Sequence, residues 1–313
     1  MNKEKYVIGI GAANVDIYGK SNIKIREHYD HPSDIQTGVG GVTRNILENI
    51  SKLGINTKLL TAVGDDIYSD LIISKTKDAN ICTKHIKRVK GEHSGIFMQV
   101  QDSNNDMYLA LCDMSVNKHI NIDYIKSKDK VIKNAVLIIL DPSIDNKVIK
   151  YIFDTYKDIP IFVDPISDNY ALKIKPYLKY ISCIKPNKTE LESLSGIKIK
   201  NENDLIKAYK KVDKLVEYLY VSLGKEGCLY KDSNGNIVKR KFNPIEKMVN
   251  ASGAGDSLMG SLVYSYINNL NIECTIDYAL AAGIATILDE NTINPKLSVK
   301  LLKKIIKEYK IWI

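Results

Sequence analysis

The stretch Asn250-Ala251-Ser252-Gly253-Ala254-Gly255-Asp256 stands directly before apolar residues that recur at helical spacing through residues 258–267. Small residues at a helix start let backbone amides approach a ligand, and the helix dipole adds partial positive charge there. Such a turn binds a phosphate group or a developing anion. Asp256, in the first turn, is placed to accept a proton from a hydroxyl. The pattern predicts phosphoryl transfer to an alcohol, although a plain glycine turn with an N-terminal charge is the structural alternative.

The composition is that of an ordinary globular protein, with 313 residues, 44% hydrophobic and 26% charged. It predicts one large α/β domain with an appendage. The net charge of +8 comes from lysines spread along the chain, which favours a solvated surface over a site for a nucleic acid polymer. We find no apolar run long enough to span a membrane, and the apolar start at residues 6–10 is too short for a signal peptide. We therefore expect a cytoplasmic protein.

The five cysteines, at positions 82, 112, 183, 228 and 274, form no CxxC pair. Paired spacing of that kind is the usual signature of a zinc site or a redox motif. We therefore expect free thiols in a reducing compartment and no zinc site.

Short apolar strands alternate with helical segments along most of the chain, which predicts a parallel sheet with crossover helices. The pattern changes at residues 95–111, where apolar and polar residues alternate on both sides of a turn at 102–106. Alternation with period two predicts a hairpin with one buried face. Because the hairpin interrupts an α/β pattern, we expect it to be part of a small sheet laid over a site.

A second glycine-rich turn, residues 38–45 (Gly-Val-Gly-Gly-Val-Thr-Arg-Asn), enters another helix. Gly40 and Gly41 permit close backbone approach to a ligand. Asn45, about one turn into the helix, offers both a donor and an acceptor to a sugar hydroxyl. The structural alternative is a plain helix start with an exposed asparagine.

Asn14 and Asp16 follow the first strand at its carboxyl end, where open α/β sheets bind ligands. Residues two apart point the same way if the strand continues. The pair is then spaced to grip two vicinal hydroxyls, although a turn stabilised by the two side chains is equally compatible with the pattern.

Two further turns follow apolar strands. Asn187 and Glu190 lie one turn apart at a helix start, where they either cap the helix or hold a hydrated Mg²⁺ through its waters. Ser222, Gly224 and Gly227 follow another strand, and their small side chains allow close approach of a nucleotide phosphate or ribose. We expect all these turns to converge on one cleft.

In order and spacing, these motifs resemble those of the PfkB (ribokinase-type) family of carbohydrate kinases over nearly the full length of the chain. Residues 38–45 match the family's first signature, and residues 250–262 match its second. Asn187 and Glu190 match its NxxE magnesium motif. The three motifs together are far more specific than any one of them.

The resemblance implies a single domain, residues 1–313, folded as a ribokinase-like three-layer α/β/α sandwich with a central mostly parallel sheet. It implies a small β-sheet lid formed by about residues 18–37 and 90–113. It also implies ATP and Mg²⁺ as cofactors and Asp256 as the catalytic base. The remaining implied sites are the anion hole (Gly253, Ala254, Gly255), the sugar site (Asn14, Asp16, Gly40, Gly41, Asn45), the nucleotide site (Asn187, Ser222, Gly224, Gly227) and the metal site (Asn187, Glu190).

Within the family, residues 111–115, 162–167, 192–197 and 294–298 resemble members that phosphorylate the nucleoside pseudouridine at its 5′-hydroxyl. Ribose, another purine or pyrimidine nucleoside, and a hexose remain open as substrates, because lid side chains select the base or sugar. A non-catalytic ligand-binding regulator is the remote alternative, which the presence of Asp256 and the glycine turn disfavours.

One departure from the family concerns a monovalent cation. Many members carry Asp-Thr where this chain has Asn250-Ala251, and that aspartate helps to bind the cation. Asn250 keeps an oxygen but loses the charge, so the resemblance leaves K⁺ open as a further cofactor. A second expectation concerns assembly. An exposed lid sheet has an unpaired edge, which pairing of two lids would cover, and we therefore expect a homodimer formed through the lid.

Overall fold

The computed structural model describes residues 5–103, 107–245 and 248–309. Its centre is a seven-stranded sheet in the order β13-β12-β11-β10-β1-β4-β6, in which every neighbouring pair is parallel. The carboxyl ends of parallel strands meet at one edge, so the residues that follow these strands gather there. The strands are β1 (Tyr6–Ile10), β4 (Asn56–Leu60), β6 (Ile81–Cys82), β10 (Leu137–Leu140), β11 (Ile161–Val163), β12 (Cys183–Ile184) and β13 (Tyr218–Leu219).

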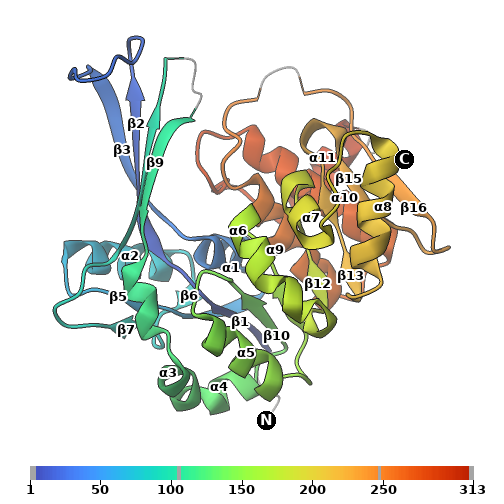
Figure 1. Ribbon diagram of the computed structural model, residues 1–313, viewed down its shortest axis with the longest axis horizontal. Helices are drawn as coiled ribbons and strands as arrows, with labels where there is room; N and C mark the ends of the chain where they lie inside the picture. Colours follow the sequence, from blue (N-terminus) through green and yellow to red (C-terminus); the bar gives the residue numbers. More distant parts are fainter. Residues whose placement is uncertain (1–4, 104–106, 246–247, 310–313) are drawn as a thin grey trace.

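Helices cover both faces of this sheet (Figure 1). The face that carries Ile8 and Ile10 packs against α3 (Ile122–Ser127), α4 (Asp129–Lys133), α5 (Asn146–Thr155), α6 (Asp168–Ile174), α7 (Lys188–Ser195) and α8 (Glu202–Asp213). The face that carries Val7 packs against α1 (Val42–Lys52), α2 (Ile67–Asp78), α9 (Ala254–Ile267) and α10 (Ile272–Ile287). The last helix, α11 (Val299–Glu308), packs on α10. The three-layer α/β/α sandwich expected from the sequence is confirmed.

The smaller elements complete the body. A three-stranded antiparallel sheet contains β14 (Val221–Ser222), β15 (Cys228–Lys231) and β16 (Ile237–Arg240), and β5 (Ala62–Val63) pairs with β7 (Lys87–Arg88). The 3₁₀ helices are η1 (Ser115–His119), η2 (Lys175–Tyr180) and η3 (Gly224–Glu226). All five cysteines are free thiols, as expected. None of the described helices combines the length and apolarity that crossing a membrane requires.

A four-stranded sheet in the order β3-β2-β8-β9 stands out from the body, and we call it the lid (Figure 1). Its strands are β2 (Asn14–Ser21), β3 (Ser33–Gly40), β8 (Gly95–Gln101) and β9 (Met107–Asp113). The lid begins at Asn14, four residues before the expected start, because the chain leaves β1 and enters β2 without a long connection. Part of the predicted hairpin turn, residues 104–106, lies outside the described residues.

Candidate active site

The first turn of α9 forms the candidate anion hole. Gly253 caps the helix with a φ of 79°, a left-handed conformation that favours glycine. A Cβ at this position would lie 2.0 Å from the carbonyl oxygen of Thr292. The amides at the start of a helix have no partner within the helix, so those of Gly253, Ala254 and Gly255 are available to an anion.

We expect Gly253→Ala to destabilise the protein more than Gly235→Ala does. Both glycines have a positive φ, which costs an alanine about 1–2 kcal/mol. Gly235 has open space around its Cα, whereas a Cβ at Gly253 meets backbone. Urea unfolding of the two variants measures the difference. Equal losses of unfolding free energy would show that the Thr292 contact relaxes without cost.

Asp256 lies in the same helical turn and is 9% exposed. Its Oδ2 accepts a hydrogen bond from Asn45 Nδ2 at 3.1 Å. Burial, together with the nearby charge of Asp164, raises the pKa of Asp256 to about 8. A carboxylate with a pKa close to the working pH is well suited to general-base catalysis.

This raised pKa predicts how stability depends on pH. The native protein holds the Asp256 proton more tightly than the unfolded chain does, so the free energy of unfolding falls as pH rises from about 4 to about 8. Asp256→Asn removes the titrating group. We therefore expect the stability of the variant relative to wild type, in the ligand-free state, to increase between pH 5 and pH 8.5. Thermal unfolding across this range checks it, and a difference that stays constant with pH would contradict it.

Lys185 and Asp164 form a buried ion pair that the sequence analysis did not assign. Each follows a strand of the central sheet, β12 and β11, and Lys185 Nζ lies 3.0 Å from Asp164 Oδ2. A Cβ on Gly255 would be 3.3 Å from Lys185 Nζ, which places the ammonium group beside the candidate anion hole. Burial alone would lower the pKa of Lys185, but the carboxylates of Asp164 and Glu190 raise it. The lysine therefore stays charged where an anion would bind.

A strained turn holds Asp164 in place. Ile166 has a φ of 66°, which is unusual for a β-branched residue and is often found at functional sites. The turn lets the Ile166 amide donate to Asp164 Oδ1 at 3.0 Å. One oxygen of Asp164 is thus fixed by backbone, and the other is paired with Lys185.

The predicted sugar-binding residues come together on the inner face of the lid and at the start of α1. Asn14 and Asp16 lie on the same face of β2, and Asn14 Nδ2 donates to Asp16 Oδ1 at 2.6 Å. Tyr18, which the sequence analysis missed, donates from its hydroxyl to Asp16 Oδ2 at 3.1 Å. Tyr18 lies two residues beyond Asp16 on the strand, and this spacing alone would have predicted that it shares the face of Asn14 and Asp16. Burial raises the pKa of Asp16, against the opposing effect of these hydrogen bonds.

The two glycines of this region are required by close contacts. Gly40 pairs with Asn14 across the β2–β3 ladder, and a Cβ on it would lie 2.1 Å from Asp16 Oδ2. Gly41 precedes α1 with a φ of 100°. Because Asn45 reaches Asp256 from the same helix, the sugar side of the site is hydrogen-bonded directly to the candidate base.

Three of the predicted nucleotide-binding residues line one cavity of about 520 Å³: Asn187, Ser222 and Gly224. Asn187 and Ser222 form an isolated parallel β-bridge. Gly227 is not among the lining residues. The structure shows a different reason why a glycine is required at this position. It has a φ of 87°, and a Cβ on it would lie 1.9 Å from the Arg240 carbonyl oxygen.

Asn187 and Glu190 form a complete capping box at the start of α7. Both oxygens of Glu190 accept hydrogen bonds from Asn187, each at 2.9 Å. Burial, and after it the nearby Asp164, raises the pKa of Glu190 to about 7. Among the described residues no group of three or more His, Cys, Asp and Glu is arranged to hold a metal ion directly. The carboxylate and amide oxygens of these two residues fit a Mg²⁺ ion held through its own waters.

The Asn250 side chain makes two hydrogen bonds to backbone, one nearby and one to a distant segment. Its Oδ1 accepts from the Ser252 amide at 2.9 Å, and its Nδ2 donates to the Glu290 carbonyl at 3.0 Å. The side chain therefore fixes the loop before α9.

Comparisons with known proteins agree with this geometry. The family profile described as pfkB family carbohydrate kinase matches residues 4–299. A pseudouridine kinase of Escherichia coli is 30% identical over 301 residues, which cover 96% of this chain and 96% of that protein. The structure of a candidate sugar kinase from Clostridium perfringens has a TM-score of 0.83 at 30% identity, covering 98% of this chain and 97% of that one. Arabidopsis thaliana ribokinase complexed with ribose and ATP shares the fold, with a TM-score of 0.81 at 21% identity over 97% of this chain and 99% of that one.

Proposed function

The chain belongs to the pfkB family of carbohydrate kinases, and we propose that it transfers the γ-phosphoryl group of ATP to the 5′-hydroxyl of pseudouridine, giving pseudouridine 5′-phosphate and ADP. The observation that carries phosphoryl transfer is the position of Asp256, a base of raised pKa in the turn that presents the candidate anion hole. The choice of pseudouridine is supported by the Escherichia coli relative of that name and by the segments described above.

In the proposed reaction, Asp256 accepts the proton of the 5′-hydroxyl as that oxygen attacks the γ-phosphorus. Phosphoryl transfer needs little covalent chemistry from the protein, so positioning and charge stabilisation dominate. The amides of residues 253–255 and the Lys185 ammonium group hold the negative charge on the transferring oxygens. Asp164 holds Lys185 at this place.

Asn14 and Asp16 are proposed to hold the two vicinal hydroxyls of the ribose. Their side chains share one face of β2 and are already joined to each other by a hydrogen bond. Phe97 pairs with Asp16 in the lid ladder, so its ring lies on the same face and is proposed to contact the base. Closure of the lid over the nucleoside would exclude water from the transferring phosphoryl group.

ATP is proposed to bind with its phosphates at Asn187, Ser222 and Gly224, which line one cavity. Mg²⁺, when bound, neutralises charge on these phosphates. Asn187 and Glu190 would hold it through water. K⁺ stays open as a further cofactor, since the Asn250 oxygen accepts one backbone hydrogen bond and keeps a second lone pair.

A substrate panel tests the assignment. We expect a coupled ADP assay with Mg-ATP to give a kcat/KM for pseudouridine at least about tenfold above those for uridine, adenosine, ribose and fructose. Faster reaction with another member of the panel would replace the substrate and keep the phosphotransferase. If none of the five compounds is phosphorylated although ATP binds, a ligand-binding regulator is favoured.

We propose further that two copies associate through the outer face of the lid, the face opposite Asp16. The ladder register places apolar side chains there, and Ile35 and Leu111 are 71% and 59% exposed. Contiguous exposed apolar surface of this kind marks an interaction site. The face is formed by Ile17, Ile35, Met98, Leu109 and Leu111.

Light scattering at micromolar concentration tests this association. We expect a dimer for wild type and a monomer for Leu111→Glu, because the new carboxylate would be buried without a partner. Leu215→Glu is the matched control, since Leu215 is 48% exposed and follows α8, outside the lid. A wild-type monomer would contradict the proposal.

A further inference from the structure

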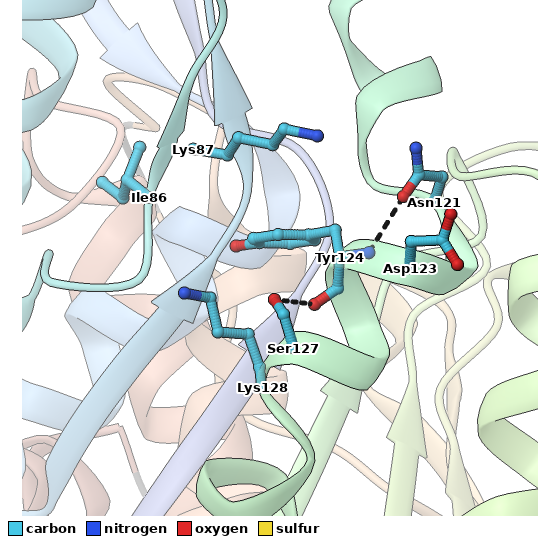
Figure 2. A pocket seen from close by; sticks show the side chains of 7 residues that line it. All are labelled: Ile86, Lys87, Asn121, Asp123, Tyr124, Ser127 and Lys128. Atoms are coloured by element: carbon cyan, nitrogen blue, oxygen red, sulfur yellow. Dashed lines mark hydrogen bonds between the residues drawn. The ribbon is translucent and has the colours of Figure 1, made fainter.

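A second cavity, of about 480 Å³, shares no lining residue with the cavity at Asn187 and Ser222, and Figure 2 shows the side chains that line it. Its lining includes Lys87, Asn121, Tyr124 and Lys128. None of these residues has a role in the phosphoryl transfer proposed above. The volume is within the range of small-molecule sites.

The cavity lies between two of the four segments that connect lid strands to the body. Lys87 belongs to β7, which precedes lid strand β8, and Asn121 precedes α3, which follows lid strand β9 and η1. These segments are already joined: Lys87 Nζ donates to the His119 carbonyl at 3.4 Å, and Lys118 Nζ lies 2.9 Å from Glu92 Oε1. A ligand in this cavity would therefore contact the connections that precede β8 and follow β9.

The cavity carries unbalanced positive charge. Lys87 and Lys128 lie on opposite sides of the Tyr124 ring (Figure 2), with their ammonium groups 5.8 Å and 5.7 Å from its centroid. Within the part of the chain that the structure describes, neither lysine forms an ion pair. Burial lowers the pKa of the neighbouring His85, and the charges of Lys128, Lys58 and Lys84 lower it further, so Lys58 and Lys84 add to this field.

The acidic residue of the lining does not cancel this charge. Asp123 is the carboxylate among the described lining residues. Figure 2 shows it at the Asn121 end of the cavity, turned away from both ammonium groups. The Asn121 amide nitrogen lies on the same side of the ring as the Lys87 ammonium group (Figure 2), and its oxygen accepts from the Tyr124 amide at 2.9 Å.

The Tyr124 ring, which lies between the two lysines, is held firmly in place. Tyr124 is buried, and its hydroxyl donates to the carbonyl oxygens of His85 and, at 3.3 Å, Thr61. Thr61 joins β4 to β5, so the ring is fixed to the central sheet. The two lysines can then adjust to a ligand without loss of the surface between them.

We propose that this cavity binds an organic polyphosphate, with one phosphate group at Lys87 and Asn121 and another at Lys128, and that the bound anion restrains the lid by holding together the connections that precede β8 and follow β9. Two separated cations call for two anionic groups, and phosphate oxygens suit both lysine and amide donors. The site is regulatory, since it lies outside the reacting groups.

Pyridoxal 5′-phosphate is a probe for the proposed binding. Its phosphate occupies one lysine position while its aldehyde condenses with the other amine to an imine and water, which borohydride then reduces to a stable amine. We expect peptide mapping to find label on Lys87 or Lys128 about tenfold ahead of Lys133 and Lys150, whose ammonium groups are paired on the surface. Pyrophosphate should protect this site. Pyridoxal without phosphate should show no such preference.

Even labelling of surface lysines, or label confined to Lys185, would overturn the site. A separate experiment tests whether the bound anion restrains the lid. It measures hydrogen exchange of residues 95–101 and 107–113 with and without pyrophosphate, in the absence of Mg²⁺. We expect pyrophosphate to slow exchange about twofold or more in wild type and in Lys133→Met, with a smaller response in the variant Lys87→Met/Lys128→Met. An equal response in all three would overturn the coupling to the lid, and the double variant should keep its basal kinase rate.

Discussion

Asp256→Asn will lower kcat by about 10²- to 10⁴-fold, the usual contribution of a general base. The amide cannot accept the proton of the attacking hydroxyl. It has nearly the shape of the carboxyl group, and Asn45 Nδ2 can still donate to its oxygen. Binding of nucleotide and nucleoside should therefore persist, which isothermal titration measures alongside the steady-state rate.

The matched control is Asp277→Asn, a half-buried acid paired with Arg240 at 2.7 Å and remote from the candidate site. It should change stability and leave kcat unaltered. If Asp256→Asn retained the wild-type turnover, the base would have to be assigned elsewhere.

Lys185→Met should produce the second large effect. The loss of a charged donor at a site of developing negative charge lowers kcat by about 10²- to 10³-fold. Folding will suffer as well, because the substitution leaves the buried Asp164 without its partner, at a cost of about 3–5 kcal/mol. The variant alone therefore does not separate catalysis from stability.

The double variant Lys185→Met/Asp164→Asn separates them. Removing both charges should restore most of the unfolding free energy, since no unpaired charge remains, while kcat stays low. Lys198→Met removes an exposed ion pair with Glu192 and should shift stability by less than about 1 kcal/mol. Recovery of kcat in the double variant would show that Lys185 serves the fold alone.

The fold was predictable from the sequence because its signals are local. Short buried strands, each followed by a helix, predict a parallel sheet, and a switch to period two predicts a separate small sheet; both were confirmed. The two glycine-rich turns were equally predictable from the sequence. Gly253 and Gly41 have left-handed backbones that the turns require.

The candidate site was only partly predictable because some of its contacts join distant parts of the chain. Lys185 and Asp164 are 21 positions apart and meet only because β11 and β12 are neighbours. The position of Lys185 directly after a buried strand could have marked it as a candidate site residue. Nothing in the sequence indicated that Asp164 is its ion-pair partner. Spacing also did not decide what Gly227 contacts, since the Arg240 carbonyl beside it comes from the next strand of the antiparallel sheet.

The burial of Asp256 beside Asp164 has a consequence for the pH at which the protein works. Together they raise the pKa of the carboxyl group in the ligand-free site to about 8. Only the deprotonated carboxylate can accept the proton of the attacking hydroxyl. At low substrate concentration the reaction should therefore speed up as pH rises toward about 8 and then level off.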